Sequence, residues 1–159
     1  MFNELNALYK EVAQLVNDMI PDKWDKFVLN AEMDKTGSGT VYFFFKHQDK
    51  VSYSLEIPAE YRIDRKVFKK LNRELYDLVW KIKQIFLKEN FGDWFSMILQ
   101  VDENQEMRID FDYTDWFNTE YGPSSRIDFV EYKYFDKKPS NDKEAKLLEE
   151  MEAFQAASK

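Results

Sequence analysis

Residues 64–89 read DRKVFKKLNRELYDLVWKIKQIFLKE, and this stretch decides the fold. Its apolar residues recur every three or four positions: Phe68, Leu71, Leu75, Leu78, Ile82 and Ile85, with Val79 and Phe86 widening the stripe. A continuous apolar stripe at this period predicts an amphipathic helix that lies on a larger apolar surface. Asp64 predicts the helix start, because its carboxylate can accept hydrogen bonds from the first backbone N–H groups. Asn90 and Gly92 predict its end.

Short apolar runs, most of them alternating with polar residues, predict five strands around this helix. Three strands are expected before it, over residues 24–33, 41–45 and 51–57, and two after it, over residues 94–101 and 107–113. Three further helices are expected over residues 3–20, 124–135 and 142–157. Asn3 is the expected N-cap of the first of these helices and Asn141 that of the last.

This order of elements predicts an α+β fold with a single domain. The sheet is expected to be mainly antiparallel and five-stranded, with a three-strand meander, the long helix and then a two-strand hairpin. Amphipathic helices are expected to pack on it. Residues 41–45 are apolar at every position, which predicts an interior strand covered on both faces. We expect one α+β domain over residues 1–137, and a loosely attached helical tail over residues 138–159.

Composition excludes several classes of chemistry. The chain has 159 residues and no cysteine, so disulfides, thiolate metal sites and thiol catalysis are excluded. No apolar run approaches the roughly 18 residues of a membrane helix, and the N-terminus does not have the pattern of a secretory signal. We therefore expect a cytoplasmic protein. The net charge of −7 disfavours nucleic acid and anionic membrane as direct partners and favours a basic protein.

The long helix is the basic part of an acidic chain. Residues 64–89 hold eight Lys and Arg against four Asp and Glu, a local charge of +4. The basic side chains Lys66, Lys69, Arg73 and Lys81 fall mostly off the apolar stripe. We interpret them as a solvated outer face rather than a nucleic-acid contact, because neither aromatic nor glycine-rich context accompanies them.

An acidic, aromatic stretch follows at residues 93–121. It holds eight carboxylates and a single base, Arg108. Near its end it also carries Tyr113, Trp116 and Tyr121. On a strand, Asp110 and Asp112 would project from one face about 7 Å apart. One interpretation is ordinary solubility chemistry with Trp116 closing the core. The other is a docking surface, in which charge steers a basic partner and aromatic side chains anchor it.

Several segments resemble the YezG/EsaG-type immunity proteins, also called nuclease antitoxins. The run IDFDYTDWFNTEY at residues 109–121 is similar to the signature segment of that family. Four further pieces resemble it in matching order: NDMIPDKW at 17–24, IPAEY at 57–61, LYDL at 75–78 and YKYF at 132–135. The resemblance covers about residues 5–137, and the tail from Lys138 onward does not align.

The resemblance implies a cytoplasmic protein that binds a DNA-cleaving toxin exported by a type VII secretion system and protects the producing cell. It implies no catalytic residue, no cofactor and no metal. The expected partner is a basic nuclease toxin domain, with no direct nucleic acid, no membrane and no small-molecule substrate. The residues expected to bind the toxin are Asp110, Asp112, Asp115, Trp116, Glu120 and Tyr121.

Two alternatives come from other classes of protein. Asp110, Asp112 and Asp115 could hold a divalent metal in an enzyme, although their spacing matches no known loop signature. His47, the single histidine, lies in a polar turn and is better interpreted as solvated than as a general base. The second alternative is an acidic scaffold or self-assembling module built on the heptad-like spacing of the long helix.

Overall fold

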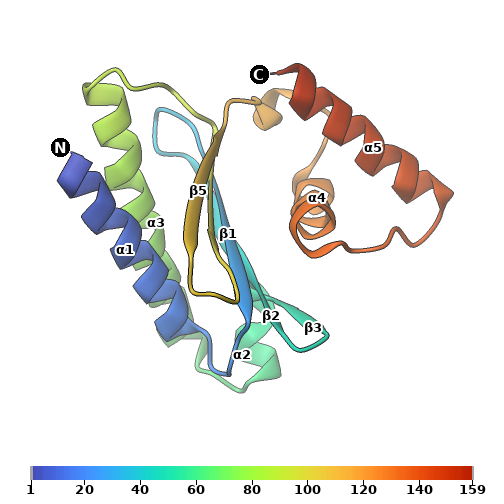
Figure 1. Cartoon of the computed structure of the whole chain (residues 1–159), viewed down its shortest axis with the longest axis horizontal. Coiled ribbons are helices and arrows are strands. Elements are labelled where there is room, and N and C mark those ends of the chain that lie inside the picture. The colour runs from blue at the N-terminus through green and yellow to red at the C-terminus, as the bar shows by residue number, and fades with distance from the viewer. Residues whose placement is uncertain (1, 159) are drawn as a thin grey trace. The chain divides into compact units, whose positions relative to one another are not determined.

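The structure is a computed structural model that describes residues 2–158, and its chain forms two compact units (Figure 1). The first unit ends at Phe111 and the second begins at Asp112. The elements up to this boundary are α1 (Phe2–Met19), β1 (Lys26–Met33), β2 (Gly39–His47), β3 (Lys50–Tyr53), η1 (Ser54–Glu56), α2 (Ile57–Glu60), α3 (Arg65–Lys88), β4 (Ser96–Val101) and β5 (Met107–Asp112). Beyond it lie η2 (Trp116–Asn118), α4 (Pro123–Phe135) and α5 (Asp142–Ala157).

The five strands form one sheet in the order β3-β2-β1-β4-β5. β1 is the central strand and pairs antiparallel with both β2 and β4, so that Leu29 stands opposite Phe43 on one side and Leu99 on the other. The hairpin after α3 therefore joins the meander through β4. The predicted α+β class and five-stranded antiparallel sheet are confirmed, and β2 is an interior strand as expected.

The core of the first unit lies between the sheet and two helices. α1 and α3 pack against each other on one face of the sheet (Figure 1). Leu29 from β1, Leu75 and Val79 from α3 and Leu99 from β4 are fully buried there. Truncating one such leucine to alanine typically costs about 2–5 kcal/mol, so this cluster fixes how the sheet and helices fit together.

The long helix α3 begins and ends where the sequence predicts. The Asp64 carboxylate accepts hydrogen bonds from the backbone N of Lys66 at 2.7 Å and of Val67 at 3.3 Å. Beyond the helix, Asn90 adopts φ of 56°, the left-handed conformation that closes helices. The four basic side chains off the stripe are exposed, as expected of a solvated face.

Lys83 is the exception on α3, because it is fully buried. Its Nζ lies 2.8 Å from the Asp93 carboxylate and 4.5 Å from the centre of the Trp94 ring, and it also donates to the Trp94 carbonyl oxygen. A buried ammonium group needs such partners to offset its lost hydration. These contacts tie the end of α3 to the segment that leads into β4.

Two boundary predictions are wrong. The third strand ends at Tyr53 rather than residue 57, and a 3-10 turn and the short helix α2 follow. The Ser54 hydroxyl oxygen accepts a hydrogen bond from the Phe43 backbone N at 3.0 Å. This side-chain hydrogen bond takes the place of the next backbone hydrogen bond between β2 and β3, where the chain leaves the sheet. Leu55 is consequently 52% exposed. Asn3 does not cap α1, because α1 already includes Phe2.

The last two helices match the sequence more closely. Asn141 caps α5 by accepting a hydrogen bond from the Glu144 backbone N at 2.8 Å, as predicted. α4 buries Arg126, Phe129 and Val130, whereas Ile127 is half-buried. The proposed division into a domain over residues 1–137 and a tail over residues 138–159 stays a prediction. None of the helices within residues 2–158 has the length and apolar character needed to span a membrane.

Candidate partner-binding surface

Asp112 organises the start of the second unit. Its Oδ1 accepts hydrogen bonds from the Thr114 backbone N at 3.0 Å and from the Thr114 hydroxyl at 2.7 Å. Its Oδ2 accepts from the Trp116 indole Nε1 and from the Gln155 amide Nε2, both at 2.9 Å. Both carboxylate oxygens thus accept hydrogen bonds from groups of the second unit, and one of these donors, Gln155, belongs to α5.

Trp116 lies in the core of this unit and is only 4% exposed. Its ring centre lies 5.9 Å from that of Tyr121 and 5.7 Å from those of Phe129 and Phe154. These separations are typical of packed aromatic pairs. Asp112 and Trp116 are thus engaged within the second unit, and their contact with a partner stays a prediction. They are positioning residues for the surface around them.

Three other predicted residues do lie at the surface of the second unit. Asp115 is exposed, and its Oδ2 accepts a hydrogen bond from the Asn118 amide at 2.5 Å. Glu120 is exposed and Tyr121 is half-buried. Desolvation raises the pKa of the Tyr121 hydroxyl, and the negative charges of Glu150 and Glu120 raise it further. The hydroxyl therefore keeps its proton at neutral pH and can donate a hydrogen bond.

Helix α5 and the η2 turn supply surface residues that the sequence did not single out. Phe154 is 40% exposed and its ring centre lies 6.0 Å from that of Tyr121. Phe117 is 39% exposed, with the Arg126 guanidinium 5.5 Å from its ring centre. Glu150 lies one helical turn before Phe154. We call the following set the acidic aromatic surface: Asp115, Phe117, Glu120, Tyr121, Glu150 and Phe154.

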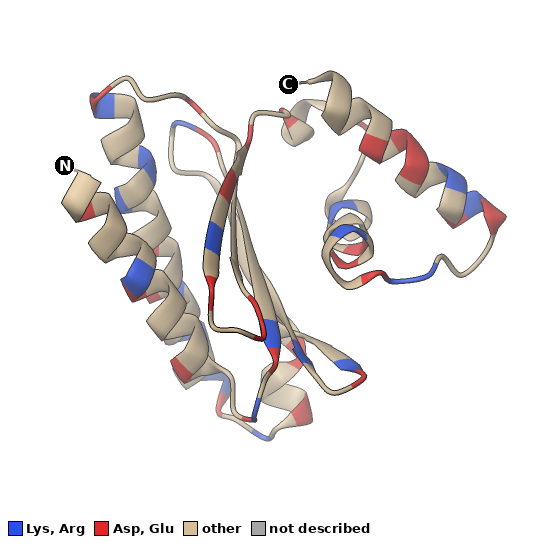
Figure 2. Cartoon of the chain, viewed as in Figure 1, with Lys and Arg blue, Asp and Glu red and all other residues tan. Residues whose placement is uncertain are grey.

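A local signal for α5 does exist in the sequence. Glu150 and Phe154 are four residues apart and so share one side of a helix. None of the segments quoted for the family resemblance lies beyond residue 135, so they do not indicate α5. The contact between Phe154 and Tyr121 joins residues 33 positions apart. Figure 2 shows the acidic residues that α5 carries.

Asp110 belongs to the first unit. It lies on β5, where its Oδ2 is 3.1 Å from the Arg108 Nε, and both side chains are substantially exposed. An exposed pair of this kind contributes about 0–1 kcal/mol to stability. The six predicted residues thus divide into Asp110 on the first unit, the half-buried Asp112 and buried Trp116 as positioning residues, and three members of the acidic aromatic surface.

The described residues offer little for a metal or a general base. Within residues 2–158, no group of three or more His, Asp or Glu side chains is arranged to hold a metal ion. The alternative with Asp110, Asp112 and Asp115 also requires Asp112 oxygens that already accept hydrogen bonds from protein donors. His47 is the last residue of β2 rather than part of the turn, and its Nδ1 lies 4.0 Å from the Asp25 carboxylate.

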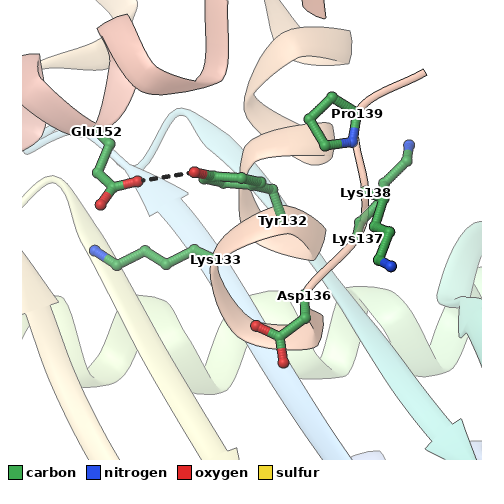
Figure 3. Close-up of a pocket in the computed structure, with 7 residues that line it drawn as sticks. All are labelled: Tyr132, Lys133, Asp136, Lys137, Lys138, Pro139 and Glu152. Atoms are coloured by element: carbon green, nitrogen blue, oxygen red, sulfur yellow. Dashed lines mark hydrogen bonds between the residues drawn. The ribbon is translucent and has the colours of Figure 1, made fainter. Parts of the chain in front are cut away.

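The second unit also has a shallow basic hollow of about 380 Å³ (Figure 3). It is lined by Tyr132, Lys133, Asp136, Lys137, Lys138, Pro139 and Glu152. Carboxylates balance much of its charge, because Asp136 and Glu152 also line it and Lys137 pairs with Asp128 at 3.1 Å. This mixed lining lacks the convergent, unpaired cations that an anion site requires.

Comparison with known proteins gives consistent matches over most of the chain. The family described as "Immunity protein YezG-like" matches residues 5–149, which extends past Lys138 into α5. The Type VII secretion system protein EsaG of Staphylococcus aureus is 32% identical over 153 residues, covering 95% of this chain and 93% of that protein. The Immunity protein YezG of Bacillus subtilis is 30% identical over 130 residues, covering 81% of this chain and 86% of that protein. Its namesake from Bacillus spizizenii is 28% identical over 132 residues, covering 82% and 81%.

Proposed function

The chain belongs to the YezG-like immunity protein family, and from this premise we propose that it neutralises a DNA-cleaving toxin in the cytoplasm of the producing cell. An immunity protein acts by binding a cognate toxin protein and is an inhibitor rather than an enzyme. The proposal adds the kind of toxin, a basic nuclease, the compartment and the surface used. One relative is named for a type VII secretion system, which supports an exported toxin as the partner.

The observation that supports this surface is the combination of charge and exposed rings on the second unit. The charges of Glu150 and Glu120 act on Tyr121, whose ring contacts that of Phe154, and Asp115 and Phe117 are exposed on the same unit. Carboxylates attract a basic surface before contact, and a nuclease domain that binds DNA carries such a surface. Partly exposed aromatic side chains then provide the area that holds a complex together.

Co-expression with a nuclease toxin tests the function. The intact chain should restore growth of cells that make the toxin and should co-purify with the toxin in a stable complex. In a plasmid-cleavage assay it should block DNA cleavage at equimolar amounts. Lack of both rescue and complex with the toxin encoded in the neighbouring reading frame would overturn the proposal.

A charge-reversal pair tests the surface. The double substitution E120K/E150K should weaken binding to a catalytically inactive toxin domain by about a hundredfold or more, as expected when two favourable charge contacts become repulsive. The matched control is E4K/E11K, which makes the same change of charge at two exposed positions of α1. Equal losses in the two variants would show that net charge, rather than this surface, determines binding.

An aromatic variant completes the test. F117A removes a ring that is 39% exposed and leaves the Asp112 hydrogen bonds untouched. Its fold should be unchanged by circular dichroism, while the dissociation rate of the toxin complex should rise. A dissociation rate equal to that of the parent would remove Phe117 from the surface.

A further inference from the structure

β5 ends the sheet and carries its longer free edge. The sheet order places β5 at one edge and β3 at the other. β3 has only four residues and leads directly into η1 and α2, which is a common way to make an edge unsuitable for pairing. β5 has six residues in regular extended conformation. Of the two edges among the described strands, β5 is the one long enough to accept another strand.

The turn before β5 determines which of its backbone groups face outward. The Asp102 backbone N donates to the Glu106 carbonyl oxygen at 3.1 Å, and Gln105 adopts φ of 63° between them. Hydrogen-bonding directions alternate along an antiparallel strand. Since the Glu106 carbonyl points toward β4, the even-numbered residues of β5 pair with β4. The odd-numbered residues Met107, Ile109 and Phe111 therefore direct their N–H and C=O groups away from the sheet.

The side chains beside this edge indicate the chemistry of a matching strand. Ile109 and Phe111 pack against the core of the first unit, and Met107 on the same face is 39% exposed. Arg108 and Asp110 occupy the opposite face and form an ion pair with each other. The segment from Asp102 to Phe111 has four carboxylates and one base, a net charge of −3. A strand beside β5 would thus meet apolar side chains on one face, the Arg108–Asp110 ion pair on the other, and net negative charge at the turn that precedes β5.

We propose that β5 is a docking strand that takes up an extended segment of the toxin, with alternating apolar and basic residues, as a sixth strand of the sheet. This mode of recognition uses main-chain hydrogen bonds for affinity and alternate side chains for selectivity. It rests on the proposed function and adds a second contact, on the first unit, to the acidic aromatic surface. The net charge of −3 on this segment favours a basic strand of the toxin over a second copy of the chain, which would bring the same negative charge.

Hydrogen exchange in the complex tests the proposal directly. In the free protein, the amides of Met107 and Ile109 should exchange fast and those of Arg108 and Asp110 slowly. With inactive toxin domain bound, the Met107 and Ile109 amides should slow by about tenfold or more, because they become part of a ladder. A tight complex in which both amides remain fast would overturn the docking strand and leave the proposed function intact. Slow exchange in the toxin-free protein that depends on protein concentration would also overturn it, in favour of self-pairing.

A proline substitution provides a second measurement. M107P removes an outward N–H at the first residue of an edge strand, where proline is tolerated, and M107A removes the same side chain but keeps the N–H. The toxin affinity of M107P should fall about tenfold below that of M107A, as expected for one lost interface hydrogen bond. Equal affinities of the two folded variants would overturn the proposal. Failure of the parent protein to bind the toxin at all would instead contradict the proposed function.

Discussion

Asp112 shows how one side chain sets the roles of its neighbours. Its two oxygens accept hydrogen bonds from Thr114, Trp116 and Gln155, which join the start of the second unit to its last helix. The indole N–H directed at this carboxylate holds the Trp116 ring inward. Tyr121 and Phe154, which pack on that ring, are thereby presented at the surface.

Removal of this carboxylate should destabilise the second unit. D112A leaves the Trp116 indole and the Gln155 amide without their acceptor, and each unsatisfied donor costs about 1–3 kcal/mol. Urea denaturation followed by tryptophan fluorescence should show a loss of this order. D115A, which removes an exposed carboxylate three residues later, should lose less than about 0.5 kcal/mol. A stable D112A variant would contradict the positioning role of Asp112.

Asp110, Asp112 and Asp115 have the same side chain but different environments. The alternation in residues 107–113 correctly predicts a strand and the inward direction of Ile109 and Phe111. It does not distinguish a carboxylate paired with Arg108 from one that accepts an indole N–H. The Asp112 carboxylate also accepts a hydrogen bond from Gln155, 43 positions away, and no local pattern contains that contact.

At the scale of elements, the hairpin between β1 and β2 depends on a carboxylate with a lowered pKa. The Thr36 hydroxyl hydrogen bond is the main cause of the lower pKa of Asp34, and the Thr36 and Ser38 backbone N–H groups contribute. Gly39, the first residue of β2, must be glycine because a Cβ at this position would collide with the backbone of Glu32.

The pH dependence of this hairpin follows from the direction of the shift. A carboxyl whose native pKa lies below its unfolded value of 3.8 stabilises the fold above that pH. This stability is lost as the pH falls through the native pKa. The melting temperature of the parent should therefore exceed that of D34N at pH 6, and the difference should shrink as the pH drops below about 4. A difference that does not change between pH 6 and pH 3 would contradict the role of the ionised form.

The stability of helix α5 depends on its N-cap, because the helix buries few side chains. These are the apolar Leu148 and Met151 and the polar Gln155. N141A removes the acceptor for the Glu144 backbone N and should cost about 1 kcal/mol. N141S retains a capping oxygen and should lose much less. Thermal melts of both variants check this, and equal melting temperatures would show that the cap contributes nothing.

The elements themselves follow largely from periodicity, and the exceptions have physical causes. The ends of α3 are correct because Asp64 and Asn90 act locally. The third strand was predicted too long because Val51, Tyr53, Leu55 and Ile57 keep period two, while the Ser54 hydroxyl ends the pairing at Phe43. The local pattern does not single out Phe129 on α4, because its burial depends on the contact of its ring with Trp116 in η2.

For the whole molecule, the net charge of −7 should influence the speed of association more than the lifetime of the complex. Raising the salt concentration from 50 to 500 mM should lower the association rate constant with the toxin domain about tenfold or more, while the dissociation rate changes less. Stopped-flow fluorescence measures both constants. An association rate that is insensitive to salt would contradict a basic partner.

The position of Trp116 provides a natural spectroscopic label. The chain has four tryptophans, and Trp24, Trp80 and Trp94 all precede the boundary at Phe111. Biosynthetic incorporation of 5-fluorotryptophan therefore assigns a single ¹⁹F resonance to the second unit, identifiable by its absence from W116F. That resonance allows the melting of the C-terminal part, and its response to a bound toxin, to be followed separately from the rest of the chain.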